Sequence, residues 1–323
     1  MKIAIVGYGN LGRGVEAALC AAPDMDAVGI FTRRDPVNVQ SVMGLPVYSM
    51  SELENMADEI DVVINCGGSA TDLPHSTPAL AEKFHVVDSF DTHAKILEHR
   101  ANADAAARKG GKVAIISVGW DPGMFSLTRL YAKSILPNSH AYTFWGTGVS
   151  QGHSDAIRRI EGVADARQYT VPIEEAIQRV RNGEAPVFKA ADMHERVCYI
   201  ALKDGANAEE IERKIVTMPD YFAPYKTTVH FVSLEQLHRE HGGLPHGGKV
   251  IVSGKAATGS EHTIEYGLNL ESNPDFTGSI LVAFARAAFK LAQNGEVGCK
   301  TAFDIPPILL SPESPEQLYA HLL

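Results

Sequence analysis

The sequence predicts an α/β protein built on a doubly wound parallel sheet, with a second, α+β domain inserted into it. Three observations support this prediction. Short apolar segments alternate with helical stretches over the first 120 residues, a glycine-rich turn joins the first strand to the first helix, and after residue 120 the pattern changes to amphipathic strands with short turns. The 323 residues, of which 45% are hydrophobic, are enough for two domains with sizeable cores.

The first domain is predicted from five short apolar segments. They lie at residues 2–6, 26–31, 61–66, 85–88 and 112–118. Strands that alternate with helices in this way form a parallel sheet that is covered by helices on both faces. The spacing of Ser51 and Glu54 is typical of a capping box and predicts a helix start there, whereas Gly110 and Gly111 predict the end of the helix before them.

The second domain is predicted from strands that follow one another more directly. They lie at residues 141–145, 194–202, 227–232, 249–256 and 262–270, with helices at 173–181 and 208–218. From residue 275 a long helix without a polar face runs to Gly295, which indicates burial against the first domain or at a subunit contact. We therefore predict one domain of residues 1–120 and 274–323, to which the C-terminal helices return, and a second of residues 121–273.

Composition limits the classes of partner. The formal net charge of −10 disfavours non-specific binding to nucleic acid or to an anionic membrane surface. Cys20, Cys66, Cys198 and Cys299 are far apart in the sequence, and we expect buried free thiols rather than disulfides or a zinc site, which suits the reducing cytoplasm. The start of the chain does not resemble a signal peptide, and no apolar run is long enough to cross a bilayer. We expect a cytoplasmic protein without a metal.

The strongest motif is the glycine-rich turn that links the first strand to the first helix. In G-Y-G-N-L-G, the first glycine permits a tight turn, the second lets backbone N–H groups approach a pyrophosphate, and the third lets helix and strand pack closely. The helix N-terminus adds partial positive charge. The first domain is therefore predicted to bind a dinucleotide in the Rossmann manner. The residues of this turn are Gly7, Tyr8, Gly9, Asn10, Leu11 and Gly12.

The end of the second strand indicates which dinucleotide binds. An NAD enzyme places an acidic residue there for the ribose 2′-OH, but this strand ends in Thr32, Arg33 and Arg34, and Asp35 comes too late. Two guanidinium groups and a hydroxyl suit a 2′-phosphate, which predicts NADP; the alternative is a merely solvated turn. Further cofactor contacts are predicted at Cys66, Gly67, Gly68, Ser69, Pro122, Gly123 and Met124.

Two acidic segments follow strands at the carboxyl edge of the predicted sheet, where ligands bind in open α/β folds. Asp91 and Asp121 could hold an ammonium group near the nicotinamide. Each aspartate also precedes a predicted helix, so that helix capping is an equal alternative on the residues alone.

Several stretches together resemble one family. V-G-Y-G-N-L-G, F-T-R-R, S-A-T-D, G-W-D-P-G-M-F-S, T-F-W-G-T-G-x-S-Q-G-H-S-D-A, L-P-H-G-G and N-P-D-F are similar to segments of the meso-diaminopimelate D-dehydrogenases, bacterial enzymes of lysine and cell-wall precursor metabolism. The resemblance runs nearly from end to end and is most specific in S-Q-G-H-S-D-A. Residues 34–53 match least.

The resemblance implies NADP-dependent oxidative deamination of meso-2,6-diaminopimelate at its D-centre. The products would be ammonia and L-2-amino-6-oxopimelate, which cyclises to tetrahydrodipicolinate. It also implies a homodimer whose second domain serves substrate binding and dimerisation. Asp91 and Asp121 would bind the D-centre ammonium and are the candidate proton acceptors. The other substrate contacts that it implies are Trp120, Trp145, Gln151, Gly152, Asp155, Thr170, Arg196, His246 and Asn273.

Other interpretations remain open on the residues alone. A turn role for His246 and a core role for Trp145 are the commoner ones, and His153 has no evident partner. Arg158 and Arg159 are expected to be solvated or paired with Glu161. At the level of function, the alternatives are another NADP-dependent oxidoreductase of amino-acid metabolism and a non-catalytic NADP(H)-binding regulator. Two acidic strand ends and several candidate carboxylate ligands favour an enzyme.

Overall fold

The computed structural model describes residues 1–219 and 221–323. The chain forms two compact units: unit 1 comprises Met1–Leu127 and Pro274–Leu323, and unit 2 comprises Thr128–Asn273. The chain thus leaves unit 1 once and returns to it. The first division falls inside helix α4 (Met124–Ile135), a few residues later than the boundary expected from the sequence.

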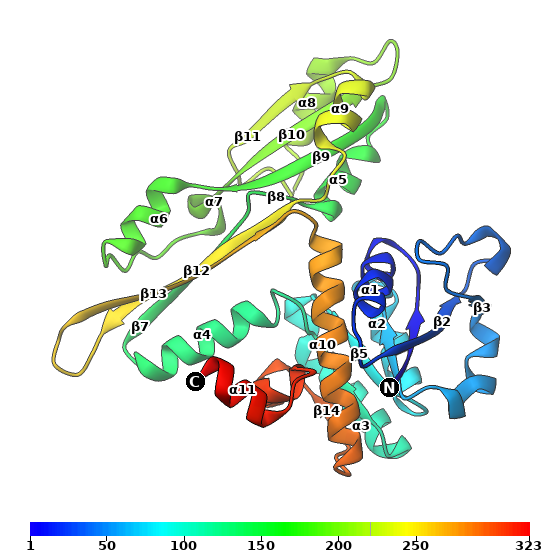
Figure 1. Ribbon diagram of the computed structural model, residues 1–323. Helices are drawn as coiled ribbons and strands as arrows, with labels where there is room; N and C mark the ends of the chain where they lie inside the picture. The colour runs from blue at the N-terminus through cyan, green and yellow to red at the C-terminus, as the bar shows by residue number, and fades with distance from the viewer. Residues whose placement is uncertain (220) are drawn as a thin grey trace. The chain divides into compact units, whose positions relative to one another are not determined.

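Unit 1 is built on a seven-stranded parallel sheet with the order β14-β6-β5-β4-β1-β2-β3 (Figure 1). The order reverses between β1 and β4, the kind of switch point at which open α/β sheets bind ligands. The predicted Rossmann-type doubly wound sheet is confirmed. The sequence pattern missed β3 and β14, which are too short to show periodicity. The strands are β1 (Lys2–Val6), β2 (Asp26–Thr32), β3 (Val47–Ser49), β4 (Val62–Asn65), β5 (His85–Asp88), β6 (Val113–Ile115) and β14 (Gly298–Lys300).

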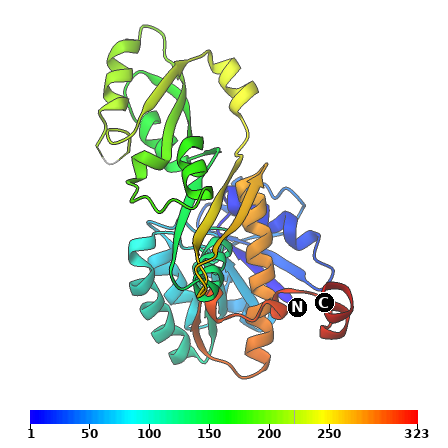
Figure 2. The ribbon, with the colours of Figure 1, turned by 90° about the vertical axis from the view of Figure 1, so that its left-hand side faces the viewer.

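Helices flank this sheet, and α10 packs closely on α1 (Figure 1, Figure 2). A Cβ on Gly14 would lie 2.4 Å from the carbonyl oxygen of Pro274, and a Cβ on Gly278 would lie 2.5 Å from the carbonyl carbon of Gly14. The long apolar helix therefore lies on unit 1. No helix in the described ranges is both long and apolar enough to span a membrane. The helices are α1 (Asn10–Cys20), α2 (Leu73–Ala81), α3 (Ile96–Gly110), α10 (Asn273–Gln293) and α11 (Pro315–Leu322), with 3₁₀ turns at Pro36–Asn38, Met50–Glu52, Glu54–Glu59, His93–Lys95, Ala302–Asp304 and Pro307–Leu310.

The capping box predicted at Ser51 and Glu54 is wrong. The chain leaves the unpredicted strand β3 at Ser49, so the box forms two residues earlier: the Ser49 backbone N–H donates to Glu52 at 2.8 Å, and the Ser49 hydroxyl accepts from the Ser51 N–H. The four cysteines are free, and Cys198 and Cys299 are buried as expected, whereas Cys66 is only partly buried. The expectation is wrong for Cys20, which is exposed because it ends α1 on its solvent side.

Unit 2 contains two sheets. An antiparallel sheet has the order β13-β12-β7, and a mixed sheet has the order β11-β10-β9-β8 with only β10 and β11 parallel (Figure 1). The strands are β7 (Ser139–Trp145), β8 (Gly148–Val149), β9 (Val163–Pro172), β10 (His194–Leu202), β11 (Thr227–Phe231), β12 (His246–Lys255) and β13 (Glu261–Leu270). The helices are α5 (Gln151–Arg158), α6 (Glu174–Arg181), α7 (Ala190–Met193), α8 (Ala208–Val216) and α9 (Leu234–His241).

One face of the mixed sheet forms the core of unit 2. Ala166 on β9 and Cys198 and Ile200 on β10 are fully buried among side chains of α5 and α8. Side chains alternate between the two faces of a strand, so Thr170 and Arg196 continue the same buried face toward its end. Sequence patterning missed β9 because its inward positions include Gln168 and Thr170, which are polar.

Candidate active site

In the glycine turn of unit 1, two glycines lie against backbone atoms and the third faces open space. Gly7 has a φ of +86° and donates its N–H to the carbonyl oxygen of Phe31 at 2.9 Å, and a Cβ on Gly12 would lie 2.5 Å from the Gly7 carbonyl oxygen. A Cβ on Gly9 would meet nothing within 4 Å. The start of α1 therefore faces open space at Gly9, where a pyrophosphate could approach the backbone N–H groups.

This difference predicts opposite effects of the same substitution. We expect Gly12→Ala to lower Tm strongly or prevent folding, because the methyl group collides with backbone that cannot shift cheaply. Gly9→Ala should leave Tm within about 2 °C of wild type but weaken NADP binding by at least about tenfold, because the methyl group fills the space for the dinucleotide. Thermal unfolding with and without NADP checks both variants. Equal losses of Tm in the two variants would contradict the assigned roles.

The turn that follows β2 lies at the same sheet edge. Thr32 is buried, and its Oγ1 accepts from the Arg34 backbone N–H at 3.1 Å, while the Arg34 guanidinium donates to the carbonyl oxygen of Tyr8. The predicted arginine turn is thus attached to the glycine turn. The hydroxyl of Thr32 holds the turn through the backbone of Arg34.

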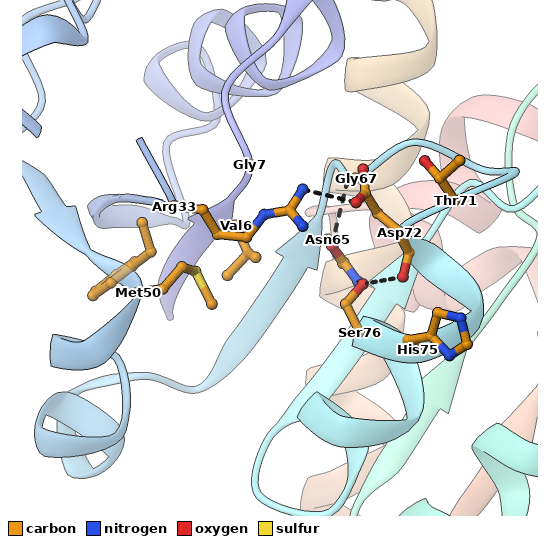
Figure 3. A pocket seen from close by; sticks show the side chains of 11 residues that line it. Val6, Gly7, Arg33, Met50, Asn65, Gly67, Thr71, Asp72, His75 and Ser76 are labelled. Atoms are coloured by element: carbon orange, nitrogen blue, oxygen red, sulfur yellow. Dashed lines mark hydrogen bonds and ion pairs between the residues drawn. The ribbon is translucent and has the colours of Figure 1, made fainter. Parts of the chain in front are cut away.

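Arg33 and Asp72 line a cavity of about 310 Å³ beside this turn (Figure 3). They form an ion pair at 2.7 Å, and the Arg33 side chain is 75% exposed. The Gly68 N–H and then Arg33 hold the pKa of Asp72 below its usual range. Because an exposed pair contributes only about 0–1 kcal/mol, a phosphate could displace Asp72 from Arg33 at little cost. Asp72 was not among the predicted site residues, although it ends S-A-T-D, one of the family-like segments.

Glu16 is a second residue of this region that was not predicted from the sequence. Its fully buried carboxylate accepts from the hydroxyls of Tyr8 and Ser41 and from the N–H groups of Val42 and Met43, the last two at 3.1 Å. The segment that matched the family least is thereby attached to α1 behind the glycine turn. The sequence does contain one indication of this role: Glu16 is an acidic residue next to Val15 on the apolar face of a helix.

The protonation of this network favours the observed hydrogen bonds. Burial raises the pKa of Glu16, but hydrogen bonds from Ser41, Tyr8, Met43 and Val42 outweigh burial and hold the pKa below its usual range. Burial, together with Glu16, raises the pKa of Tyr8 to about 12. At neutral pH, Tyr8 therefore donates to an ionised Glu16.

The Glu16 pKa predicts a pH-dependent effect of Glu16→Gln. At about pH 7 we expect this variant to be less stable by about 2–3 kcal/mol, because an amide cannot accept from four donors. A carboxyl whose folded pKa is lowered stabilises the protein above its unfolded pKa of about 4.3, and this contribution is lost as the pH falls through the folded pKa. Urea unfolding should therefore show the difference between variant and wild type shrinking below about pH 4. Glu98→Gln, an exposed change on α3, serves as the control, and a difference independent of pH would contradict this assignment.

The Asp88 side chain connects the two segments that follow strands β5 and β6. Its buried carboxylate accepts from the backbone N–H groups of Phe90 and Ser117 at 3.0 and 2.9 Å, and bonds Thr77 Oγ1 and His99 Nε2, each at 2.7 Å. These contacts fix the segments after β5 and β6. The predicted catalytic residues Asp91 and Asp121 belong to these segments.

Within unit 1, the predicted residues after β4, β5 and β6 are partly brought together. Asp91 is exposed, and its N–H donates to the Ser69 hydroxyl at 2.9 Å, so this aspartate lies beside the predicted cofactor loop. Trp120 is buried with its ring edge-on to Phe125 at 5.4 Å. A tight turn from Gly119 through Asp121 to Gly123 leads into α4, and a Cβ on Gly123 would lie 1.9 Å from the Gly119 carbonyl oxygen.

Within unit 2, three of the predicted substrate residues meet around β8. Thr170 and Arg196 are directly opposite each other on β9 and β10, and the Arg196 guanidinium donates to the Thr170 hydroxyl. Gly148 on β8 pairs with Thr170 on its other side. A Cβ on Gly148 would lie 2.5 Å from the imidazole Cγ of His246, so this ring packs directly on the glycine. Burial lowers the pKa of His246, which favours the neutral imidazole.

Trp145 and His153 have partners that the sequence did not reveal. Trp145 is 38% exposed rather than in the core, and its ring stacks on His194 at 5.4 Å. Burial lowers the pKa of His194 to about 4, so this ring is neutral, and its Nε2 accepts from the backbone N–H of Trp145 at 2.9 Å. His153, expected to be unpartnered, bonds Ser150 Oγ at 2.7 Å.

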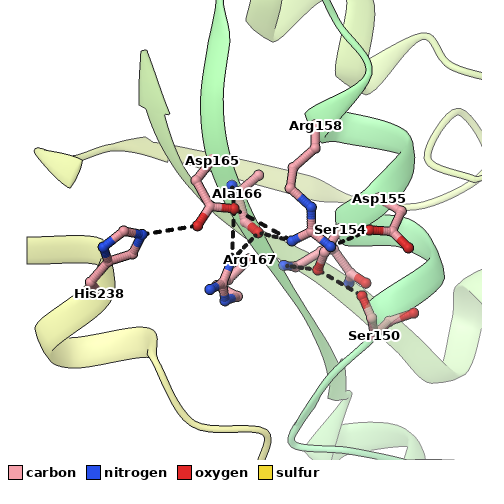
Figure 4. A network of polar contacts seen from close by, with 9 residues as sticks. Ser150, Ser154, Asp155, Arg158, Asp165, Ala166, Arg167 and His238 are labelled. Carbon is pink, nitrogen blue, oxygen red and sulfur yellow. Dashed lines mark hydrogen bonds and ion pairs between the residues drawn. The ribbon is translucent and has the colours of Figure 1, made fainter. Parts of the chain in front are cut away.

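Helix α5 carries the remaining polar positions. Gln151 and Gly152 begin the helix and are exposed. Asp155 pairs with Arg158, whose guanidinium also lies 3.5 Å from Asp165 (Figure 4). The alternative that Arg158 pairs with Glu161 is wrong, because α5 ends before residue 161 and the arginine extends toward β9 instead.

The last predicted substrate residue, Asn273, lies at the start of α10. Its backbone N–H donates to the Leu244 carbonyl oxygen at 3.0 Å. Among residues 1–219 and 221–323, no group of three or more His, Cys, Asp or Glu side chains could hold a metal ion.

Comparison with known proteins identifies the family. Residues 119–272 match the family model described as diaminopimelic acid dehydrogenase C-terminal domain. The chain is 57% identical over 323 residues to the meso-diaminopimelate D-dehydrogenase of Ureibacillus thermosphaericus, covering 100% of this chain and 99% of that protein. The chain belongs to the meso-diaminopimelate D-dehydrogenase family. Its membership confirms the resemblance and the class, an oxidoreductase that acts on a CH–NH₂ group, and neither a non-catalytic regulator nor an oxidoreductase of another family remains as an alternative.

Solved structures of meso-diaminopimelate D-dehydrogenases and a related engineered enzyme share this fold. The structure of the Corynebacterium glutamicum DAP dehydrogenase in complex with DAP has a TM-score of 0.92 and 46% identity, covering 100% of this chain and 99% of that one. An engineered D-amino acid dehydrogenase bound to NADP+ has a TM-score of 0.87 and 44% identity, with the same coverage. Both structures therefore match the whole of this chain.

Proposed function

We propose that this chain oxidises meso-2,6-diaminopimelate at its D-centre with NADP, releasing ammonia and L-2-amino-6-oxopimelate, which cyclises to tetrahydrodipicolinate. The observation that carries the proposal is Arg196, a buried guanidinium in unit 2 for which no carboxylate lies within ion-pair distance among the described residues. A buried charge without a protein counter-ion is costly unless a ligand supplies one. The distal carboxylate of diaminopimelate has the required charge. The Corynebacterium relative was solved with DAP bound.

The proposed cofactor is NADP. Support comes from the open space at Gly9, the Arg33–Arg34 turn attached to the glycine turn, and the cavity beside Arg33. An engineered relative was solved with NADP+. We propose that the following residues bind this cofactor or shape its site: Gly7, Tyr8, Gly9, Asn10, Leu11, Gly12, Thr32, Arg33, Arg34, Cys66, Gly67, Gly68, Ser69, Pro122, Gly123 and Met124.

The proposed substrate contacts divide by charge. In unit 1, Asp91 and Asp121 bind the D-centre ammonium beside Trp120. In unit 2, Arg196 and Thr170 bind the distal carboxylate, with neutral His246 as a further donor. The remaining contacts proposed in unit 2 are Trp145, Gln151, Gly152, Asp155 and Asn273.

The proposed chemistry asks the protein mainly to orient groups and to move one proton. NADP supplies the nicotinamide that accepts a hydride when it is bound. Asp91 or Asp121 takes a proton from the ammonium, directly or through water, so that the nitrogen lone pair can form the C=N bond as hydride leaves the carbon. Water then adds to the imine carbon and ammonia leaves. Both aspartates remain candidates for the proton acceptor.

We further propose a cytoplasmic homodimer that forms through unit 2. The four free cysteines suit a reducing compartment. Tyr131 and Ile135 lie four residues apart on α4 within unit 2 and are 58% and 67% exposed, which suits an apolar contact with a second copy. Sedimentation velocity measures the oligomeric state directly.

The absorbance of reduced cofactor tests the proposed reaction. The chain is incubated with NADP and meso-, L,L- or D,D-diaminopimelate at equal concentrations. We expect rapid reduction with the meso isomer and little with the other two, because only the meso isomer presents a D-centre together with an L-centre at the distal contacts. Failure to reduce NADP with the meso isomer, or equal rates with the L,L isomer, would overturn the proposal.

A further inference from the structure

Arg196 is held at three points, none of them acidic, and two of these points involve its buried guanidinium. It is 8% exposed, and its backbone N–H donates to the Lys226 carbonyl oxygen at 2.9 Å. Its guanidinium donates to the Thr170 hydroxyl, and its carbon lies over the Tyr225 ring, 4.1 Å from the ring centroid. Within the described residues, the Arg196 Nε has no hydrogen-bond partner. This guanidinium therefore has a buried donor whose hydrogen-bonding capacity the described residues do not satisfy.

Tyr225 is itself fixed by the core of unit 2. Its backbone N–H donates to the carbonyl oxygen of Phe222 at 2.8 Å, and Phe222 is fully buried with Ile211 and Ile215 of α8. The next residues lead into β11, where Thr227 pairs with Arg196. The ring and the arginine are thus attached to neighbouring strands, which sets their separation. No residue pattern around A-P-Y-K indicates this contact in the sequence.

An aromatic partner has a consequence that an acidic partner would not have. A carboxylate beside Arg196 would neutralise the guanidinium and compete with a ligand for its N–H groups. An aromatic ring beneath the guanidinium carbon attracts the cation through its face, by about 0.5–2 kcal/mol, and does not neutralise the charge. The ring also restricts the motion of the guanidinium, which helps this group to bind a carboxylate at two points.

We propose that Tyr225 is a positioning residue for substrate selection: through the contact of its ring with the Arg196 guanidinium it holds this group in place for the distal carboxylate and so favours D-amino acids that carry a second carboxylate. This inference rests on the proposed function, in which Arg196 binds that carboxylate. It adds a residue that does not touch the reacting atoms. Its loss should weaken substrate binding far more than it slows the chemical step.

The test compares Tyr225→Leu and Tyr225→Met, which remove the aromatic face, with Tyr225→Phe, which retains it. For the first two variants we expect KM for meso-diaminopimelate to rise about tenfold, with kcat changed less than about threefold and KM for NADP unchanged. Tyr225→Phe should restore KM to within about threefold of wild type. Methionine provides a second volume-filling side chain should leucine impair folding. Tyr221→Leu is the matched control, because Tyr221 is a 40% exposed tyrosine of the same segment whose ring contacts His153.

A second substrate pair isolates the carboxylate. D-2-aminopimelate and D-2-aminoheptanoate have the same chain length, but only the first carries a distal carboxylate. The ratio of their kcat/KM values should fall about tenfold in Tyr225→Leu and Tyr225→Met and remain near the wild-type value in Tyr225→Phe and Tyr221→Leu. An unchanged ratio and KM in an active, folded Tyr225→Met protein would overturn the inference alone. Absence of meso-diaminopimelate turnover in the wild-type chain would overturn the proposed function and the inference with it.

Discussion

Replacing Arg33 and Arg34 together with alanine is expected to lower kcat/KM for NADP by about 100- to 1,000-fold and kcat/KM for NAD by less than about threefold. Each charge-assisted hydrogen bond to a phosphate contributes about 1.5–3 kcal/mol, and NAD lacks the phosphate that would accept them. The variant should therefore lose its preference for NADP rather than its capacity for hydride transfer.

The present contacts of the two arginines predict different single-variant effects. Arg33 pairs with Asp72 in an exposed ion pair, so its removal affects little besides the phosphate. Arg34 donates to the Tyr8 carbonyl oxygen and so also holds the glycine turn. Arg34→Ala alone should consequently weaken NAD binding somewhat, whereas Arg33→Ala alone should not.

Steady-state kinetics with both cofactors at saturating substrate measure these effects. Arg108→Ala is the matched control, because Arg108 is an exposed arginine of unit 1 on α3 that pairs with Asp104. Equal losses for NADP and NAD in the double variant would show that the arginines serve only the fold of the turn.

Replacing Arg196 with methionine is expected to lower kcat/KM for meso-diaminopimelate by about 100- to 1,000-fold while leaving Tm unchanged or higher. The guanidinium is buried without a carboxylate partner among the described residues, so it costs desolvation energy that no protein counter-ion offsets. Methionine fills a similar volume without the charge. The distal carboxylate of the substrate, in contrast, would lose its counter-ion.

Kinetics and thermal unfolding of the same preparations distinguish a binding role from a structural one. A structural role for Arg196 predicts a lower Tm, with losses that do not depend on the substrate. The binding role predicts a stable protein in which the preference for D-2-aminopimelate over D-2-aminoheptanoate is lost. Arg196→Lys should recover only part of the wild-type activity, because an ammonium cannot form the two parallel hydrogen bonds of a guanidinium.

The features that could be predicted depend on residues that are consecutive in the sequence. The strand, the glycine turn and the helix that form the first β-α unit occupy residues 2–20, and the arginine turn follows the very next strand. Their periodicity and glycine spacing are local properties, so the predicted doubly wound sheet agrees with the structure. The capping box at Ser51 was misplaced because the three-residue strand before it carries too short a pattern.

The missed features depend on contacts between distant segments. Glu16 bonds residues 41–43, and Asp72 pairs with Arg33 across the ends of two strands. Tyr225 meets Arg196 only because β10 and β11 pair side by side. In the sequence, each of these residues is an ordinary acid or tyrosine.

The sequence by itself therefore determined the sheet class, the dinucleotide turn, the basic turn that follows β2 and, through its motifs, the family. The tertiary structure alone decided which buried charges are neutralised within the chain and which are not. Glu16 is surrounded by donors, whereas Arg196 has a hydroxyl and an aromatic ring and no carboxylate among the described residues. The reason is that a charge's cost depends on every group within a few ångströms of it, and strand pairing brings those groups from positions far apart in the chain.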